Sequence, residues 1–154
     1  MTIYQLLRKD HEELLGLFDQ VVETTERAEK TRTEVLQKIK EALIPHAKAE
    51  QKVLYTRLEK NEVSHDITIE AEEEHRVAER LLKELLAMDV QHEHWIAKMT
   101  VLQEALDHHI EEEQDDMFKK AEKVLTTEEA VQLGEEFLEE KKAILEKLQA
   151  EETV

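Results

Sequence analysis

The chain has 154 residues, enough for a single domain with its own hydrophobic core. Two residues are glycine, one is proline and 38% are charged, a composition that favours helices over strands and tight turns. The formal net charge of -17 argues against binding to nucleic acid or to an anionic membrane, and the absence of cysteine excludes disulfides, thiolate metal sites and cysteine nucleophiles.

Apolar residues recur at spacings of three and four along five segments, which predicts five amphipathic helices. The expected ranges are 2–28, 32–60, 66–88, 90–122 and 127–150. Capping-box pairs predict three of the helix starts, namely Thr2 with Gln5, Thr31 with Glu34, and Thr126 with Glu129. Asp89 is a candidate N-cap for the fourth helix, although no glycine or proline marks that boundary.

The first four helices are joined by short connections, and we expect an all-α, up-down-up-down four-helix bundle over residues 3–122. A shift of 63 or 64 residues lays the hairpin at about 3–60 on the hairpin at about 66–122, so the bundle is expected to contain two copies of one hairpin. An additional C-terminal amphipathic helix at 127–150 is expected to pack on this bundle, on a second copy of the chain or on another partner.

The chain lacks the long apolar run of a signal peptide or of a transmembrane helix. We therefore expect a soluble, cytoplasmic protein with neither a membrane nor a nucleic acid as its partner.

Six polar residues fall inside the apolar stripes, with at least one in each helix of the expected bundle. They are His11, His46, Glu50, His75, His109 and Glu113. Burying imidazoles and ionised carboxylates without partners is costly, and two metal cations that bind all six side chains would offset that cost. Each His-x-x-x-Glu motif places a nitrogen and an oxygen one turn apart on the same helix face. Mixed nitrogen and oxygen ligation without thiolate suits iron or manganese, with zinc as a further alternative.

Two local stretches share a longer pattern, in which a glutamate follows a histidine by four residues and an aromatic residue follows it by nine. They are Pro45-His46-Ala-Lys-Ala-Glu50-Gln-Lys-Val-Leu-Tyr55 and His109-Ile-Glu-Glu-Glu113-Gln-Asp-Asp-Met-Phe118. Together with the upstream His11 and His75, this pattern resembles the HHE family, the hemerythrin-type cation-binding domains, over roughly residues 3 to 121.

The resemblance implies a non-haem di-iron centre with two iron ions, bridged by oxygen or by carboxylates. In such a centre the four histidines are terminal ligands, and Glu50 and Glu113 are the bridges. Manganese and zinc are less favoured by the resemblance than iron.

One departure from the family pattern concerns the third helix. The oxygen-carrying hemerythrins have a fifth histidine ligand there, in a pair one turn apart, whereas Ala71 and Glu79 flank His75 in this chain. Either one iron has an open or water-filled position, or Glu79 or another group such as Tyr4 completes its ligand set. This shifts the expectation from simple oxygen carriage toward reaction with peroxide, nitric oxide or O2, or toward iron handling.

The resemblance thus implies a protein that binds or reacts with O2, peroxide or nitric oxide at its metal centre. If it is an enzyme, it would be a di-iron oxidoreductase, but no individual residue is assigned a catalytic role. The alternatives are an iron-sensing or iron-storage module without catalysis, and a purely structural bundle. Other polar and aromatic residues are interpreted as solvated histidines (His65, His92, His94 and His108), surface acids (Glu111 and Glu112) and packing aromatics (Tyr55 and Phe118).

Overall fold

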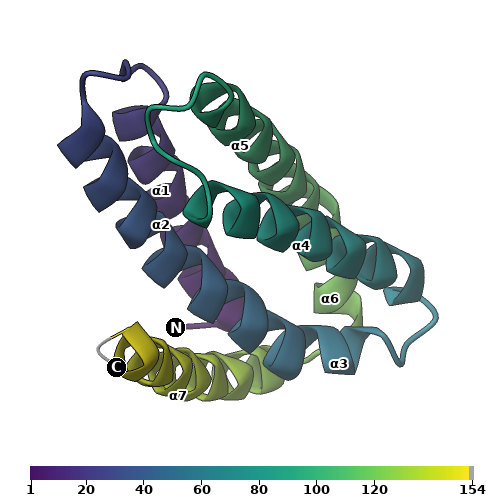
Figure 1. Ribbon diagram of the computed structural model, residues 1–154. Coiled ribbons are helices and arrows are strands. Elements are labelled where there is room, and N and C mark those ends of the chain that lie inside the picture. The colour runs from purple at the N-terminus through teal and green to yellow at the C-terminus, as the bar shows by residue number, and fades with distance from the viewer. Residues whose placement is uncertain (153–154) are drawn as a thin grey trace.

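The computed structural model describes residues 1–152, which fold into helices and connecting turns with no strand among them. The bundle is made of α1 (Ile3–Val21), α2 (Glu29–Glu50), α4 (His65–Leu86) and α5 (Trp95–Glu112) (Figure 1). The second and fourth bundle helices continue as η1 (Gln51–Tyr55) with α3 (Thr56–Leu58), and as η2 (Glu113–Met117) with α6 (Phe118–Val124). The chain then enters α7 (Thr127–Glu152). The predicted all-α bundle with an additional C-terminal helix is confirmed.

Two of the three predicted capping boxes form. The Gln5 backbone N–H donates to the Thr2 hydroxyl, and the Glu129 N–H donates to the Thr126 hydroxyl at 3.1 Å, with the return bonds also present. The prediction at Thr31 is wrong, because α2 already begins at Glu29 and encloses that residue.

Two connections, from α1 to α2 and from α4 to α5, are longer than predicted, and the buried side chain of Arg32 holds them together. The Arg32 guanidinium donates to the backbone carbonyls of Thr24 and Val90, both at 2.7 Å, and lies 4.8 Å above the Trp95 ring. Both carbonyls lie in the turns outside the helices, since α1 ends at Val21 and α5 begins only at Trp95. Asp89 is therefore not an N-cap.

The core consists of two apolar clusters with a polar layer between them. One cluster contains the apolar residues of α1 from Leu14 to Val21, together with buried apolar residues of α2, α4 and α5. The other contains Ile3, Leu6 and Leu7 of α1, together with buried apolar residues of α7 and of the opposite ends of the bundle helices. Along every helix of the bundle, the buried histidine falls between these two clusters. The fold thus places the polar layer in the middle of the bundle, with apolar packing above and below it.

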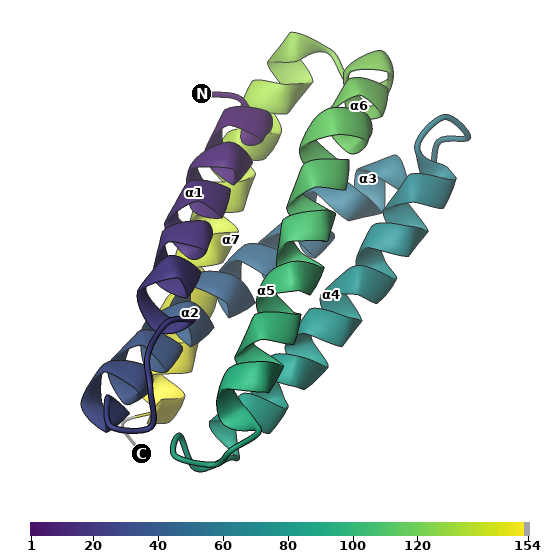
Figure 2. The same cartoon turned by 90° about the horizontal axis from the view of Figure 1, so that it is seen from above.

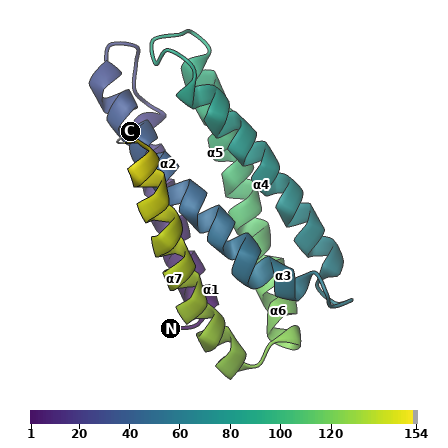
Figure 3. The same ribbon diagram turned by 60° about the horizontal axis from the view of Figure 1, so that its bottom comes forward.

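The C-terminal helix packs on the first hairpin. α7 contacts α1 and α2 and lies on the side of that hairpin away from α4 and α5 (Figures 2 and 3). Its buried residues Ala130, Leu133 and Phe137 complete the cluster at the N-terminal end of α1. None of the helices within residues 1–152 has the length and apolar character needed to cross a membrane.

Two helical glycines differ in their surroundings and form a matched pair of tests. A Cβ atom added at Gly134 of α7 would lie 2.8 Å from the Met1 carbonyl oxygen and 3.2 Å from the Ile3 nitrogen, whereas one added at Gly16 of α1 would meet nothing within 4 Å. We expect Gly16→Ala to raise the free energy of unfolding by about 0.5–1 kcal/mol through helix propensity.

Gly134→Ala makes the same gain in helix propensity but forces α7 away from the start of α1. We expect it to lower the free energy of unfolding by about 1–3 kcal/mol, the usual cost of overpacking. Urea denaturation of the two variants measures both effects. Equal stabilisation by both substitutions would show that α7 does not approach α1 this closely.

Candidate metal centre

The six residues predicted from the sequence come together in the polar layer. His11 comes from α1, His46 and Glu50 from α2, His75 from α4 and His109 from α5, and Glu113 is the first residue of η2. None of the six is more than 6% exposed.

Each glutamate lies between two histidines from different hairpins. A Glu50 carboxylate oxygen is 3.7 Å from Nε2 of His46 on its own helix and 3.3 Å from Nε2 of His75. The Glu113 oxygens are 3.2 Å from Nε2 of His109 and 3.2 Å from Nε2 of His11. Both carboxylates therefore link the two hairpins, which is the position that a bridging ligand requires.

Ligand atoms of four of these residues gather most closely. Glu50, His75, His109 and Glu113 each offer an atom within 4.8 Å of the others, while His11 and His46 approach one glutamate each from the side of the first hairpin. The rings of His11 and His46 face each other with centroids 5.2 Å apart.

A seventh polar group lies at the centre of the cluster. The Tyr55 hydroxyl donates to Glu113 at 2.6 Å, lies 3.2 Å from a Glu50 oxygen, and is 3.4 Å and 3.5 Å from Nε2 of His75 and His109. The interpretation of Tyr55 as a packing aromatic is therefore wrong. Phe118, its counterpart in the internal repeat, packs as expected, with its ring centroid 5.1 Å from that of Tyr4.

The π-helical segment η1 explains why Tyr55 faces inward. In an α-helix, a residue five positions along is rotated by about 140° from the first, so Tyr55 would point away from the face of Glu50. In a π-helix the backbone bonds join residues five apart and bring them onto nearly the same face. Both Glu50 and Glu113 stand where α-helix gives way to a π-helical segment.

The two further candidates from the sequence are not among the converging groups, although Glu79 lines a pocket that also contains His75. The Tyr4 hydroxyl is buried without a hydrogen-bond partner near Phe118, and burial, with the negative charges of Glu122 and Glu129, raises its pKa to about 12. The Glu79 carboxylate lies 3.2 Å from Lys83. The structure brings neither polar group within hydrogen-bond distance of the six.

Three histidines are oriented by partners that the sequence analysis missed. Nδ1 of His46 donates to Asp10 at 2.9 Å, Nδ1 of His109 donates to Glu74 at 2.8 Å, and Nδ1 of His11 donates to the Gln114 side-chain oxygen at 2.7 Å. These bonds fix the proton on Nδ1, so the Nε2 lone pairs turn toward the centre, as in histidines that bind metals.

The internal repeat contained a signal for two of these partners. Asp10 precedes His11 and Glu74 precedes His75, at equivalent positions of the two hairpins. Each acid serves the histidine of the neighbouring helix in its own hairpin, Asp10 for His46 and Glu74 for His109.

The electrostatics of the layer match a site that competes with protons for its lone pairs. Burial, with the negative charge of Glu113, raises the pKa of Glu50 well above its usual range. Burial opposes ionisation of Glu113, but the imidazoles of His109 and His11, each with Nε2 3.2 Å from a Glu113 oxygen, outweigh it and hold that pKa well below normal. Burial likewise opposes charge on His109, but bonds to Glu113 and Glu74 raise its pKa to about 9. Burial and the charge of His109 lower the pKa of His75 to about 3.

Several buried atoms of the layer have no hydrogen-bond partner among the described residues. They include Nε2 of His11, Oε2 of Glu50 and Oε1 of Glu113. Buried polar atoms without partners are rare in folded proteins, and these belong to side chains that converge on one volume. The donor set of imidazole nitrogens and carboxylate oxygens fits a metal cation. The chain thus has a buried His/Glu cluster able to bind metal.

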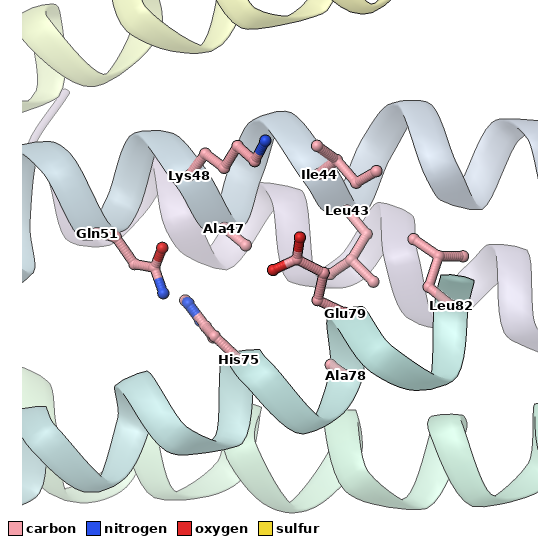
Figure 4. Close-up of a pocket in the computed structure, with 9 residues that line it drawn as sticks. All are labelled: Leu43, Ile44, Ala47, Lys48, Gln51, His75, Ala78, Glu79 and Leu82. Atoms are coloured by element: carbon pink, nitrogen blue, oxygen red, sulfur yellow. The ribbon is translucent and has the colours of Figure 1, made fainter. Parts of the chain in front are cut away.

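A narrow pocket reaches the layer between α2 and α4 (Figure 4). Apolar side chains line part of it, and the side chains of Gln51 and His75 point toward each other across it. The charged residues Lys48 and Glu79 also line it, and its apolar walls come from Leu43, Ile44, Ala47, Ala78 and Leu82. The buried Nδ1 of His75 has no hydrogen-bond partner, unlike Nδ1 of the other three histidines.

A four-helix bundle with histidines and glutamates buried in a middle layer is the architecture of a helical cation-binding domain. The model of the hemerythrin HHE cation binding domain matches residues 2–121, and the chain belongs to that family. The crystal structure of an HHE domain-containing protein from Mycobacterium kansasii, a homologue of Rv2633c, is similar in fold, with a TM-score of 0.81 and 23% identity over 97% of this chain and 93% of that one. No curated protein matches the chain.

The opposite pKa shifts of His75 and His109 predict how the stability of the metal-free protein depends on pH. Unfolded histidine titrates near pH 6.5. The raised pKa of His109 stabilises the fold below pH 6.5, and this contribution is lost as the pH rises toward about 9. The lowered pKa of His75 makes the unfolded state bind the extra proton as the pH falls from 6.5 toward about 3.

We therefore expect the combined contribution of these two histidines to the free energy of unfolding of the metal-free protein to be largest near pH 6.5 and to fall on both sides. Chemical denaturation at pH 5, 6.5 and 9 measures this. Protein with bound metal is the control, because coordinated imidazoles no longer take up protons in this range. A steady rise in stability from pH 6.5 to 9 would contradict the assignment for His109.

Proposed function

We propose that the chain is a di-iron protein that binds or reacts with O2, peroxide or nitric oxide at a position left open by the protein ligands. The observation that carries this proposal is the convergence of unpartnered atoms of His11, Glu50 and Glu113 in one buried layer. Four histidines and two glutamates supply donors for two cations, with each carboxylate between two histidines.

Tyr55 is the group we propose in place of the missing fifth histidine. Its hydroxyl lies within 3.5 Å of four of the six residues, which places its oxygen among the atoms that would hold the cations. Phenolate oxygen is a hard donor that suits ferric iron better than zinc, which favours iron among the metals that accept nitrogen and oxygen ligands.

The side chains of the layer hold and orient, and the surrounding core keeps water out. Asp10, Glu74 and Gln114 fix the histidine rings, the Tyr55 hydroxyl is hydrogen-bonded to Glu113 in the metal-free protein and would give up its proton on binding iron, and the narrow pocket limits access to small molecules. Bound iron would supply the Lewis acidity and the redox chemistry for a small oxidant.

The test combines elemental analysis with absorption spectroscopy on protein purified without added metal. We expect two irons per chain, ligand-to-metal bands that change on addition of peroxide or nitric oxide, and a visible phenolate band that Tyr55→Phe removes. Tyr4→Phe is the matched control and should leave the spectrum unchanged. A Tyr55→Phe protein with an unaltered spectrum would exclude Tyr55 as a ligand, and iron-loaded protein that ignores both small molecules would refute the proposed reactivity.

Iron sensing is a second candidate, and one contact favours it. The Lys141 ammonium of α7 lies 2.8 Å and 3.0 Å from the two oxygens of Asp10, and Asp10 in turn holds His46. The Phe137 ring of the same helix meets the His46 ring edge-on, with centroids 5.9 Å apart. A change at His46 on metal binding is thereby passed to α7.

If the chain senses iron, removal of iron should reduce hydrogen-exchange protection along α7. In Lys141→Met, protection should become independent of iron, because the ion pair with Asp10 is lost while the methylene packing is kept. Lys142→Met is the matched control, since it removes the same charge from the neighbouring position. Protection of α7 that is equal with and without iron in the native chain would refute the sensing function.

A further inference from the structure

A second group of metal-ligand side chains converges on the surface between α4 and α5. Nε2 of His108 lies 3.2 Å from a Glu112 oxygen and 3.5 Å from Oε2 of Glu74, and all three ligand atoms are within 4.8 Å of one another. His108 is 68% exposed, while Glu74 and Glu112 are 21% and 22% exposed. One imidazole and two carboxylates from two helices form a ligand set suited to a divalent cation, and solvent reaches it.

This group is directly connected to the central layer. The other oxygen of Glu74, Oε1, accepts the hydrogen bond from Nδ1 of His109 at 2.8 Å. A crevice beside it is lined by Glu74, Glu112, His109 and Glu113, with Ile67, Ala71 and Met117 as its apolar walls. Glu113 is 1% exposed, and its Oε1 has no hydrogen-bond partner among the described residues. That oxygen lies 3.2 Å from Nε2 of His11, so Glu113 joins the crevice wall to the central layer.

At the equivalent position in the first hairpin, the acid is already paired with a lysine side chain. Asp10 corresponds to Glu74 in the internal repeat, and its outer oxygen is paired with the Lys141 ammonium at 2.8 Å. Glu74 has no lysine or arginine partner among the described residues, and its outer oxygen faces His108 instead. In the first hairpin a lysine therefore neutralises this acid, whereas in the second hairpin the equivalent acid faces a histidine and is available to bind a cation.

We propose that Glu74, His108 and Glu112 form an outer divalent-cation site from which Fe2+ is delivered to the central site. The delivery role rests on the proposed function, whereas the existence of the outer site does not. The net charge of -17 attracts cations to the surface, and the outer site holds them at the crevice.

The first experiment measures binding at the outer site in protein whose central site is already loaded with iron. Titration with Zn2+ by calorimetry should show one additional ion per chain, with affinity weakened at least tenfold in the double variant His108→Ala/Glu112→Gln. Glu74 is left unchanged because it orients His109. The matched control is His94→Ala/Glu111→Gln, which removes the same residue types and charge from exposed positions and should bind Zn2+ like the native chain.

The second experiment measures delivery. Metal-free protein is mixed anaerobically with limiting Fe2+, and uptake is followed by the absorbance that develops after exposure to O2 at set times. We expect the double variant to reach the same final iron content as the native chain but at least fivefold more slowly, with the control variant unchanged. Equal final content shows that Glu113 and its neighbours are intact in the variant.

The outcomes separate this inference from the proposed function. Equal Zn2+ binding by all three proteins would overturn the outer site, and lost Zn2+ binding with unchanged uptake would overturn delivery. In a third outcome, the double variant loses Zn2+ binding and takes up iron slowly, while the spectrum of the iron-loaded native protein does not change with peroxide or nitric oxide. That result would support the outer site and refute the proposed oxidant chemistry.

Discussion

The requirement to bury four imidazoles and two carboxylates in one layer governs this fold. Such groups are costly in an apolar core unless every nitrogen and oxygen has a partner. Two apolar clusters close the layer from both ends, and each helix of the bundle supplies at least one of its members. Because each glutamate contacts histidines from both hairpins, the layer also sets how the two hairpins pack against each other.

Helical periodicity and the internal repeat predicted the bundle and the inward direction of the six residues. They failed where the backbone leaves the regular α-helix. Tyr55 faces the layer because the π-helical segment η1 shifts the register of the side chains after Glu50. With 3.6 residues per turn, Tyr55 would lie on another face of the helix. The helix starts at residues 29 and 95 were missed as well, and the turns before them are held by tertiary contacts of Arg32 that periodicity cannot reveal.

The outer group of Glu74, His108 and Glu112 was not predicted from the sequence for a different reason. His108 and Glu112 are ordinary surface residues when each is considered alone, and only the packing of α4 on α5 brings them to Glu74. By contrast, Asp10 and Glu74 were within reach of the sequence, since an acid precedes the histidine at equivalent positions of both hairpins. A repeat of neighbouring polar pairs is therefore informative even when only one member of each pair lies in the apolar stripe.

The two hairpins share one pattern but surround the layer differently. The second hairpin has Phe118 where the first has Tyr55, so only one of them places a hydroxyl among the central groups. On the outer side, α7 seals the first hairpin through Lys141 and Asp10, while Glu74 remains open toward His108 and the crevice. Two cations in this layer would consequently have unequal surroundings. α7 covers the first hairpin on the side away from α4 and α5, whereas the pocket that contains His75 opens where the two hairpins meet, between α2 and α4.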